Sequence, residues 1–252
     1  MPKRENTYLI LGDYSSKEQR QEDKTIKSFA DSVGEFLLKE KRIKKVEKEY
    51  SSNSMTSKKL LEMIEEGVYD KDKDNIVKEI KNSKYISITL GINDVIKDIK
   101  YDLLNDEFIY NMDVLESKID IFNHNYYKII EEIKDINKDA KVILVGVCNG
   151  YDDIVFERIN DSIKDVAAYS ENIYVETSDI KDEYLYLDNK LYLNNKGQEI
   201  LANKVILMIK ETYWLWYHKL RWFYERYFKN INQNKRCNRI NIYFVLLSIY
   251  WL

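Results

Sequence analysis

Short runs of aliphatic and β-branched residues alternate with long helical patterns over the first 210 residues of the chain. Such runs, bounded by polar residues or glycine, predict buried β-strands. The clearest runs are Thr7 to Leu11, Tyr85 to Leu90, Lys141 to Val147 and Ile173 to Thr177. A weaker strand is predicted between Ile43 and Tyr50, where Ile43 and Val46 are the only aliphatic residues.

Between the strands, apolar residues recur at i, i+3, i+4 and i+7, which is typical of helices with one buried face. These stretches run from Ile26 to Leu37, from Met112 to Ile133 and from Ile154 to Ala167. Strands that alternate with helices predict a parallel sheet covered on both faces. We therefore expect residues 1–210 to form one α/β domain of about five parallel strands, followed by a helical tail over residues 211–252.

Charge and aromatic residues separate this tail from the body. The formal net charge is −3, and the tail contains seven Lys and Arg against Glu211 and Glu225, so the tail carries +5 and the body −8. All four tryptophans, at positions 214, 216, 222 and 251, also lie in the tail. An acidic body has no electrostatic footprint for nucleic acid, so no nucleic-acid partner is predicted.

In an open parallel sheet, ligands bind beyond the carboxyl ends of the strands. The segments that leave the predicted strands are small and polar, as expected for a site. They are Gly12 to Ser16, Ser51 to Ser57, Gly91 to Asp94, Cys148 to Gly150 and Asp188 to Gly197.

These segments resemble the motifs of the SGNH (GDSL) hydrolases. The resemblance includes Gly12-Asp13 after the first strand, "TSKKLLEMI" from Thr56, "ISITLGIND" ending at Asp94, and Asn195-Lys196-Gly197 before the last helix. The motifs occur in the family's order between about Tyr8 and Ile209. The resemblance implies a flavodoxin-like three-layer sandwich with strand order 2-1-3-4-5, and it implies the ester-hydrolysing function of bacterial lipases and esterases.

The family's nucleophile and base positions are both occupied by tyrosine here. The family serine follows Gly-Asp, where this chain has Tyr14, and the family histidine aligns with Tyr192. The usual aspartate aligns with Asn189, and Asp188 stands one residue too early. A phenol with a pKa of about 10 is a poor substitute for an activated serine or a neutral-pH base. We therefore expect a catalytically impaired member, a pseudoenzyme.

The family's oxyanion-hole positions are better preserved. Asn93 matches the family asparagine and is the best candidate donor to an oxyanion or ligand, with Gly91 allowing the tight turn and Asp13 completing the first motif. Ser54 occupies the position of a family glycine, so its backbone donor depends on whether its φ angle must be positive. Asp94 is expected to cap a helix or to accept hydrogen bonds from loop amides.

An alternative is an active esterase with a displaced nucleophile, Ser15 or Ser16, and an unconventional base such as Asp188. Neither histidine is expected to supply the base, since His124 lies off its helix's apolar stripe and His218 lies in the tail. Two cysteines form no disulfide framework, and no Cys/His cluster has metal-ligand spacing, so neither a metal nor a cofactor is predicted. The resemblance implies an acyl ester or acetylated glycan as ligand.

The tail leaves three readings open: binding to a membrane surface, packing or self-association, and a segment without function. Its apolar end, Ile240 to Leu252, is shorter than the roughly 20 residues that span a bilayer. The polar N-terminus, Met1 to Asn6, shows no secretory signal. We therefore expect a cytoplasmic protein, peripheral at the membrane if the tail binds lipid.

Overall fold

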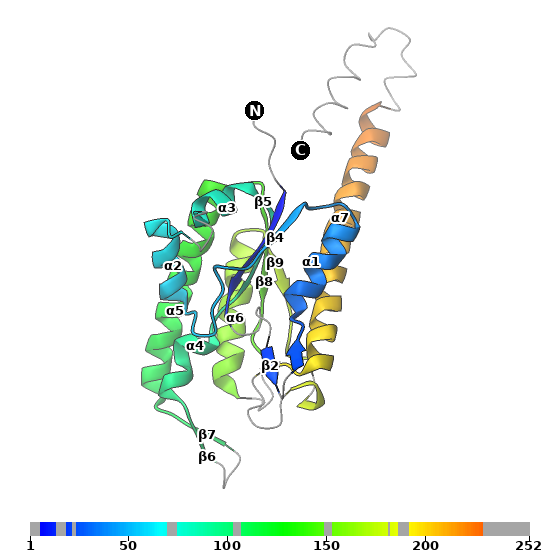
Figure 1. The fold of residues 1–252 in the computed structure, drawn as a ribbon. Helices are drawn as coiled ribbons and strands as arrows, with labels where there is room; N and C mark the ends of the chain where they lie inside the picture. The colour runs from blue at the N-terminus through cyan, green and yellow to red at the C-terminus, as the bar shows by residue number, and fades with distance from the viewer. Residues whose placement is uncertain are drawn as a thin grey trace. The chain divides into compact units, whose positions relative to one another are not determined.

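A computed structural model describes residues 6–13, 19–21, 24–69, 75–102, 107–148, 153–180, 182–185 and 192–228, with side chains described up to residue 212. Its centre is a five-stranded parallel sheet (Figure 1). The strands of this sheet are β1 (Thr7–Gly12), β4 (Lys45–Glu47), β5 (Ser83–Thr89), β8 (Lys141–Val145) and β9 (Ile173–Val175).

The strand order of this sheet is β4-β1-β5-β8-β9, with every neighbouring pair parallel. Counting only these five strands along the chain, the order is 2-1-3-4-5. The expected α/β sandwich is therefore confirmed, including the weak strand predicted between Ile43 and Tyr50. That strand is only three residues long, because few apolar residues are available there to pack against the helices.

Helices cover both faces of the sheet. The first face carries α1 (Phe29–Lys39) and the beginning of α7 (Asn195–Phe228), which are joined where the Phe29 N–H donates to Gln198 Oε1 at 2.7 Å. The second face carries α2 (Ser57–Glu66), α3 (Ile76–Asn82), α5 (Met112–Ile136) and α6 (Ile154–Tyr169) (Figure 1). A short helix, α4 (Ile92–Val95), and a 3₁₀ turn (Ile96–Asp98) follow β5, and another 3₁₀ turn spans Asp182–Tyr184.

Alternating residues of β1 show how the sheet is buried on both sides. Leu9 and Leu11 belong to the hydrophobic core formed with α2, α3, α5 and α6, whereas the Tyr8 ring lies near Gly34 of α1. All these residues of β1 have no exposed surface. Burial of both faces explains why the strand reads as a continuous apolar run rather than as an alternating one.

Two antiparallel hairpins interrupt the α/β pattern and were not predicted. They are β2 (Gln19–Gln21) with β3 (Lys24–Ile26), and β6 (Lys100–Asp102) with β7 (Glu107–Ile109). Ile26, which we expected to begin the first helical stripe, therefore lies in β3. The helix begins at Phe29 because Ser28 and Asp31 form a reciprocal capping box at its N-terminus.

The chain divides into two compact units, of which the second begins at Leu207 within α7. The helix continues to Phe228, and residues 229–252 lie outside the described part of the chain. In the part that is described, no helix combines the length and apolar character needed to cross a bilayer.

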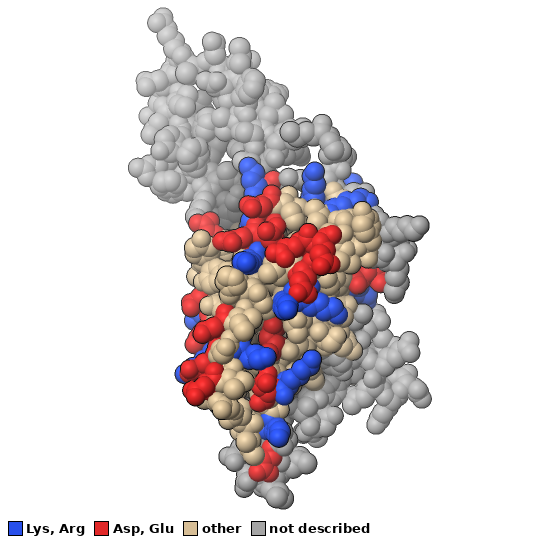
Figure 2. Space-filling view, turned by 90° about the vertical axis from the view of Figure 1, so that its left-hand side faces the viewer, with Lys and Arg blue, Asp and Glu red and all other residues tan. Residues whose placement is uncertain are grey.

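On the side of the first unit that carries α2 and α5, Asp and Glu side chains are interspersed with Lys and Arg side chains, and the broadest acidic group lies toward the upper end of the described surface (Figure 2). The described surface on this side is thus mixed in charge rather than uniformly basic.

Gly12 provides the most direct test of the sheet geometry. Its φ is +130°, and a Cβ atom there would lie 2.1 Å from Thr89 O, which is main chain and cannot move aside. Gly12→Ala is expected to reduce the free energy of unfolding by about 3 kcal/mol or more. Urea denaturation measures this change.

Gly67→Ala serves as the matched control. Gly67 also has a positive φ, +64°, but the nearest atom to its added Cβ would be a side-chain nitrogen, Asn75 Nδ2, at 3.0 Å. This variant should lose only about 1–2 kcal/mol, the cost of a left-handed non-glycine residue. Equal losses at the two positions would contradict the assigned close approach of β1 and β5.

Candidate functional site at the carboxyl ends of the strands

The predicted site segments follow the carboxyl ends of β1, β4, β5 and β8. Because these strands are parallel, their carboxyl ends lie along one edge of the sheet, at the lower end of the sheet in Figure 1. The structure describes Gly12, Asp13, Ser54, Gly91, Asn93 and Tyr192 of the predicted set. Tyr14, Ser15, Ser16, Asp188 and Asn189 lie outside the described residues, so their predicted roles remain predictions.

The first segment is held tightly against the end of β5. The Asp13 N–H donates to Thr89 O at 2.9 Å, and Asp13 is only 2% exposed. The missing side chain of Gly12 allows this contact, because any Cβ would collide with Thr89. The contacts with β5 therefore fix the position of the backbone up to Asp13, where the chain leaves β1.

The second segment packs on the first through main-chain hydrogen bonds. The Ser52 N–H donates to Gly12 O at 3.0 Å, and the Ser51 hydroxyl donates to Ile10 O at 2.8 Å. A turn closes where the Met55 N–H donates to Ser52 O at 3.0 Å, leaving Ser54 exposed.

Ser54 does not have a positive φ. A side chain is therefore tolerated where the family has glycine, and the backbone donor of Ser54 is not excluded by its conformation.

Asn93 connects the third segment to the second. Its Nδ2 donates to Asn53 O at 3.0 Å and to Met55 O at 2.9 Å. A side-chain amide has two N–H donors, so this arrangement uses both of them. The group that the sequence predicts as an oxyanion donor thus holds the turn that carries Ser54, and its predicted role remains a prediction.

Gly91 permits this position of Asn93. Its φ is +128°, and a Cβ atom would lie 2.6 Å from Ile159 Cγ2 of α6. The turn after β5 therefore passes so close to α6 that a side chain at position 91 would collide with Ile159, a contact that the sequence did not predict.

Asp94 anchors the start of α2. Its carboxylate accepts the Ser57 N–H at 3.0 and 3.2 Å and the Ser57 hydroxyl at 2.6 Å. Asn125 of α5 in turn donates to Ser57 Oγ at 3.1 Å. This confirms the structural role expected for Asp94, through a loop amide far along the chain rather than through the helix that follows it. Burial raises the pKa of Asp94, and the hydrogen bonds from Ser57 oppose that shift.

Tyr192, which the sequence predicts to align with the base position, packs half-buried against the large hydrophobic core. The neighbouring Asn194 caps α7 by accepting the Gly197 N–H at 3.1 Å, and its Nδ2 donates to Glu183 O at 2.9 Å. His124 is exposed on α5, as expected, and the side chain of His218 is not described. Among the side chains that are described, no imidazole lies beside Tyr192.

Two buried groups near Asp13 were not singled out by sequence. Burial raises the pKa of the Cys148 thiol to about 12, and the charge of Asp13 adds to that rise. Burial also raises the pKa of Tyr126 well above its usual value, with Asp13 and Asp94 contributing.

Both groups are neutral at physiological pH, and a neutral thiol is a weak nucleophile. In the sequence, Cys148 was visible only as part of a segment that follows a predicted strand, and Tyr126 only as part of an apolar helical stripe.

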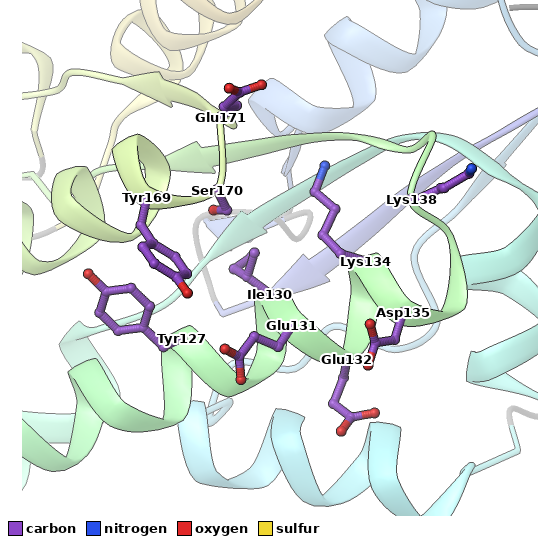
Figure 3. Close-up of a pocket in the computed structure, with 10 residues that line it drawn as sticks. All are labelled: Tyr127, Ile130, Glu131, Glu132, Lys134, Asp135, Lys138, Tyr169, Ser170 and Glu171. Carbon is purple, nitrogen blue, oxygen red and sulfur yellow. The ribbon is translucent and has the colours of Figure 1, made fainter.

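A cavity of about 650 Å³ lies elsewhere, between the C-terminal ends of α5 and α6. Figure 3 shows Tyr127 and Tyr169 facing each other, and their ring centroids are 5.3 Å apart. These helix ends lead into the amino ends of β8 and β9, so the cavity is at the opposite edge of the sheet from the site. Over the described side chains, no cluster of three or more potential metal ligands occurs.

Comparisons with solved structures identify the fold as that of GDSL-like lipases and esterases. A putative GDSL-like lipase from Parabacteroides merdae superimposes with a TM-score of 0.58 and 12% identity, covering 82% of this chain and 96% of the other. The esterase EstA from a Pseudoalteromonas species gives 0.57 and 16%, covering 83% and 98%. A carbohydrate esterase of family 3 from Talaromyces cellulolyticus gives 0.54 and 14%, covering 82% and 99%.

Sequence comparisons add little to this. The uncharacterized protein YpmR of Bacillus subtilis is 23% identical, over 73% of this chain and 74% of its own. No protein-family model matches the sequence. The fold is thus established, and the activity has to be argued from the site.

The hydrogen bonds of Asn93 predict a measurable structural role. Asn93→Ala removes both donors and leaves two carbonyl groups without them, so the free energy of unfolding should fall by about 1–3 kcal/mol. Asn93→Asp should lose at least as much, because it places a carboxylate against the two carbonyl oxygens. Unfolding in urea measures both, and a loss below about 0.5 kcal/mol for both variants would show that the amide does not hold the turn.

The raised pKa of Asp94 predicts a pH dependence of stability. A carboxyl group whose pKa is higher in the folded state than in the unfolded chain favours folding when protonated. Its contribution is complete below the unfolded pKa and is lost as pH rises through the folded pKa. The unfolding free energy of the wild type relative to Asp94→Asn should therefore fall between pH 3 and pH 7.

Denaturation of both proteins across this pH range measures the difference. A difference that instead grows with pH would show that the Ser57 hydrogen bonds outweigh burial. Asp94→Ala is the companion variant, and it should be less stable than Asp94→Asn at every pH, because it leaves the Ser57 N–H without an acceptor.

Proposed function

We propose that this chain is an SGNH-fold protein whose ester-hydrolysing activity is lost or severely impaired, and whose site retains a ligand-binding role. The observation that carries the proposal is the packing of Tyr192, at the base position, against the hydrophobic core. A general base must titrate near the working pH and must be free to receive a proton. A phenol, whose ordinary pKa is about 10, is poorly suited to the first requirement.

The nucleophile position supports the same proposal from the sequence. Tyr14 replaces the serine that follows Gly12-Asp13. In serine hydrolases the nucleophile and base act as a unit, and loss of one member typically lowers kcat by about 10⁴-fold or more. With both positions altered, any residual rate depends on binding and on the oxyanion donors.

The side-chain donor expected to stabilise the oxyanion, Asn93, is also occupied by other groups. Stabilising a developing negative charge requires N–H groups aimed at the oxyanion. Both N–H groups of the Asn93 side chain are occupied by main-chain carbonyls of the second segment. Catalysis would therefore need Asn93 to release the turn, which adds to the barrier.

The proposed ligand class follows from the proteins that share the fold. Their names describe lipases, an esterase and a carbohydrate esterase. We therefore propose an acyl ester or an acetylated glycan as the ligand of the carboxyl-edge site. Its polar main-chain groups and small side chains suit the carbonyl oxygen of such a ligand.

The catalytic part is tested with the full-length chain and p-nitrophenyl acetate. We expect turnover at the rate of buffer alone, and no adduct with a fluorophosphonate probe by intact mass. Turnover that is abolished by Ser15→Ala or Ser16→Ala would contradict the proposal and would establish a displaced nucleophile. Ser178→Ala, in the turn after β9, is the matched control serine.

The binding part is tested separately by calorimetric titration with an acetylated xylo-oligosaccharide and with ethyl butyrate. Saturable heat with at least one of them is expected. Absence of heat with both would reject the proposed ligand class, whatever the result of the hydrolysis assay.

A further inference from the structure

The C-terminal part of α7 carries a pattern that the α/β fold does not explain. The helix runs to Phe228, and its second half belongs to the unit that begins at Leu207. Of the sixteen residues from 213 to 228, eleven are aromatic residues or leucine. Large contiguous apolar surfaces, when they are exposed, mark sites of interaction with proteins or membranes.

Helical geometry sorts these positions into two sides. With 3.6 residues per turn, seven positions share roughly one third of the circumference. They are Tyr213, Trp216, Tyr217, Leu220, Phe223, Tyr224 and Tyr227. We call these seven positions the aromatic side, and it contains no charged residue.

Basic positions fall outside the aromatic side. Lys219, Arg221 and Arg226 lie there with one acid, Glu225, and with the four remaining large apolar residues, which are Trp214, Leu215, Trp222 and Phe228. Further Lys and Arg residues follow between positions 229 and 239, and the net charge from Glu211 to the end is +5. Amphipathic helices with Trp, Phe and Leu on one side and Lys and Arg on the other bind in the interface of anionic bilayers.

We propose that residues 213–228 lie along an anionic lipid surface, with the aromatic side at the level of the lipid headgroups and acyl-chain boundary. Trp and Tyr favour this depth, and the basic positions are attracted to anionic headgroups. Helix α7 lacks the apolar character needed to cross a bilayer, which fits a helix lying in the interface.

Charge distinguishes this partner from a second copy of the same tail. Two tails that each carry +5 repel one another, whereas anionic lipid neutralises that charge. The aromatic composition alone would serve either partner. The excess of Lys and Arg therefore favours lipid over self-association.

The experiment is flotation of the full-length chain with vesicles of phosphatidylcholine containing 30% phosphatidylserine. We expect binding that is at least tenfold weaker on pure phosphatidylcholine. Lys219→Gln/Arg221→Gln/Arg226→Gln should weaken binding to the anionic vesicles by about tenfold to a hundredfold, since each basic residue near the surface contributes to attraction. Lys58→Gln, in an exposed position of α2, is the charge control and should bind like the wild type.

Two tryptophans of the same helix provide a matched pair. Trp216 is on the aromatic side, and Trp222 lies outside it. Trp216→Ala should weaken binding by about tenfold or more, and Trp222→Ala by less than about threefold. Trp216→Tyr should retain binding, and circular dichroism identifies any variant that loses helix.

Tryptophan fluorescence reports the environment of the tail alone, because all four tryptophans lie between positions 211 and 252. Anionic vesicles should shift the fluorescence emission to shorter wavelength. No binding to anionic vesicles, or equal losses for Trp216→Ala and Trp222→Ala, would overturn the proposal. The proposal would also be overturned if the wild-type chain formed a stable oligomer in sedimentation, if Trp216→Ala dissociated that oligomer, and if the wild-type chain did not bind vesicles. These outcomes are independent of the hydrolysis assay, which tests a different part of the chain.

Discussion

The close approach of β1 to β5 at Gly12 is the constraint on which the site depends. The contact is possible only without a side chain, since Thr89 main-chain and side-chain atoms fill the space where a Cβ would stand. It fixes Asp13 against β5, and Gly12 O then accepts the N–H of Ser52. The second segment is thereby positioned on the first, and Asn93 and Asp94 hold it from the side of β5. Hydrogen bonds thus fix the first three segments of the edge relative to one another.

If hydrolysis is lost as proposed, the same bonds would still hold the architecture of the edge together. Hydrolysis needs a nucleophile, a base and free N–H donors at one point. Here the base position contributes a ring to the core, and the amide of Asn93 supports a turn. Cys148 and Tyr126, the buried groups closest in chemical character to replacements, are kept neutral by burial. The stability of the edge thus rests on groups that catalysis would require to be available.

The sequence predicted the layers well and the contacts of the site only in part. The buried strands and amphipathic helices were visible because they bury long apolar runs, and even the three-residue β4 followed from Ile43 and Val46. The β2–β3 and β6–β7 hairpins were missed because strands of three residues are too short to show a hydrophobic period. The partners of Asn93 lie about forty residues away in the chain, so no local pattern could show that its amide is already used. The φ of Ser54 likewise depends on a turn whose closure only the fold determines.

The hydrogen bonds of Asn93 and Asp94 also bear on how such proteins are recognised. Both side chains hold main-chain groups of another segment, so mutation of either has a folding cost that is independent of turnover. A chain that loses ester hydrolysis would therefore still need Gly91, Asn93 and Asp94 in order to fold. The sequence pattern Gly91-x-Asn93-Asp94 thus reports the architecture of the turn after β5, and it does not by itself establish hydrolytic activity.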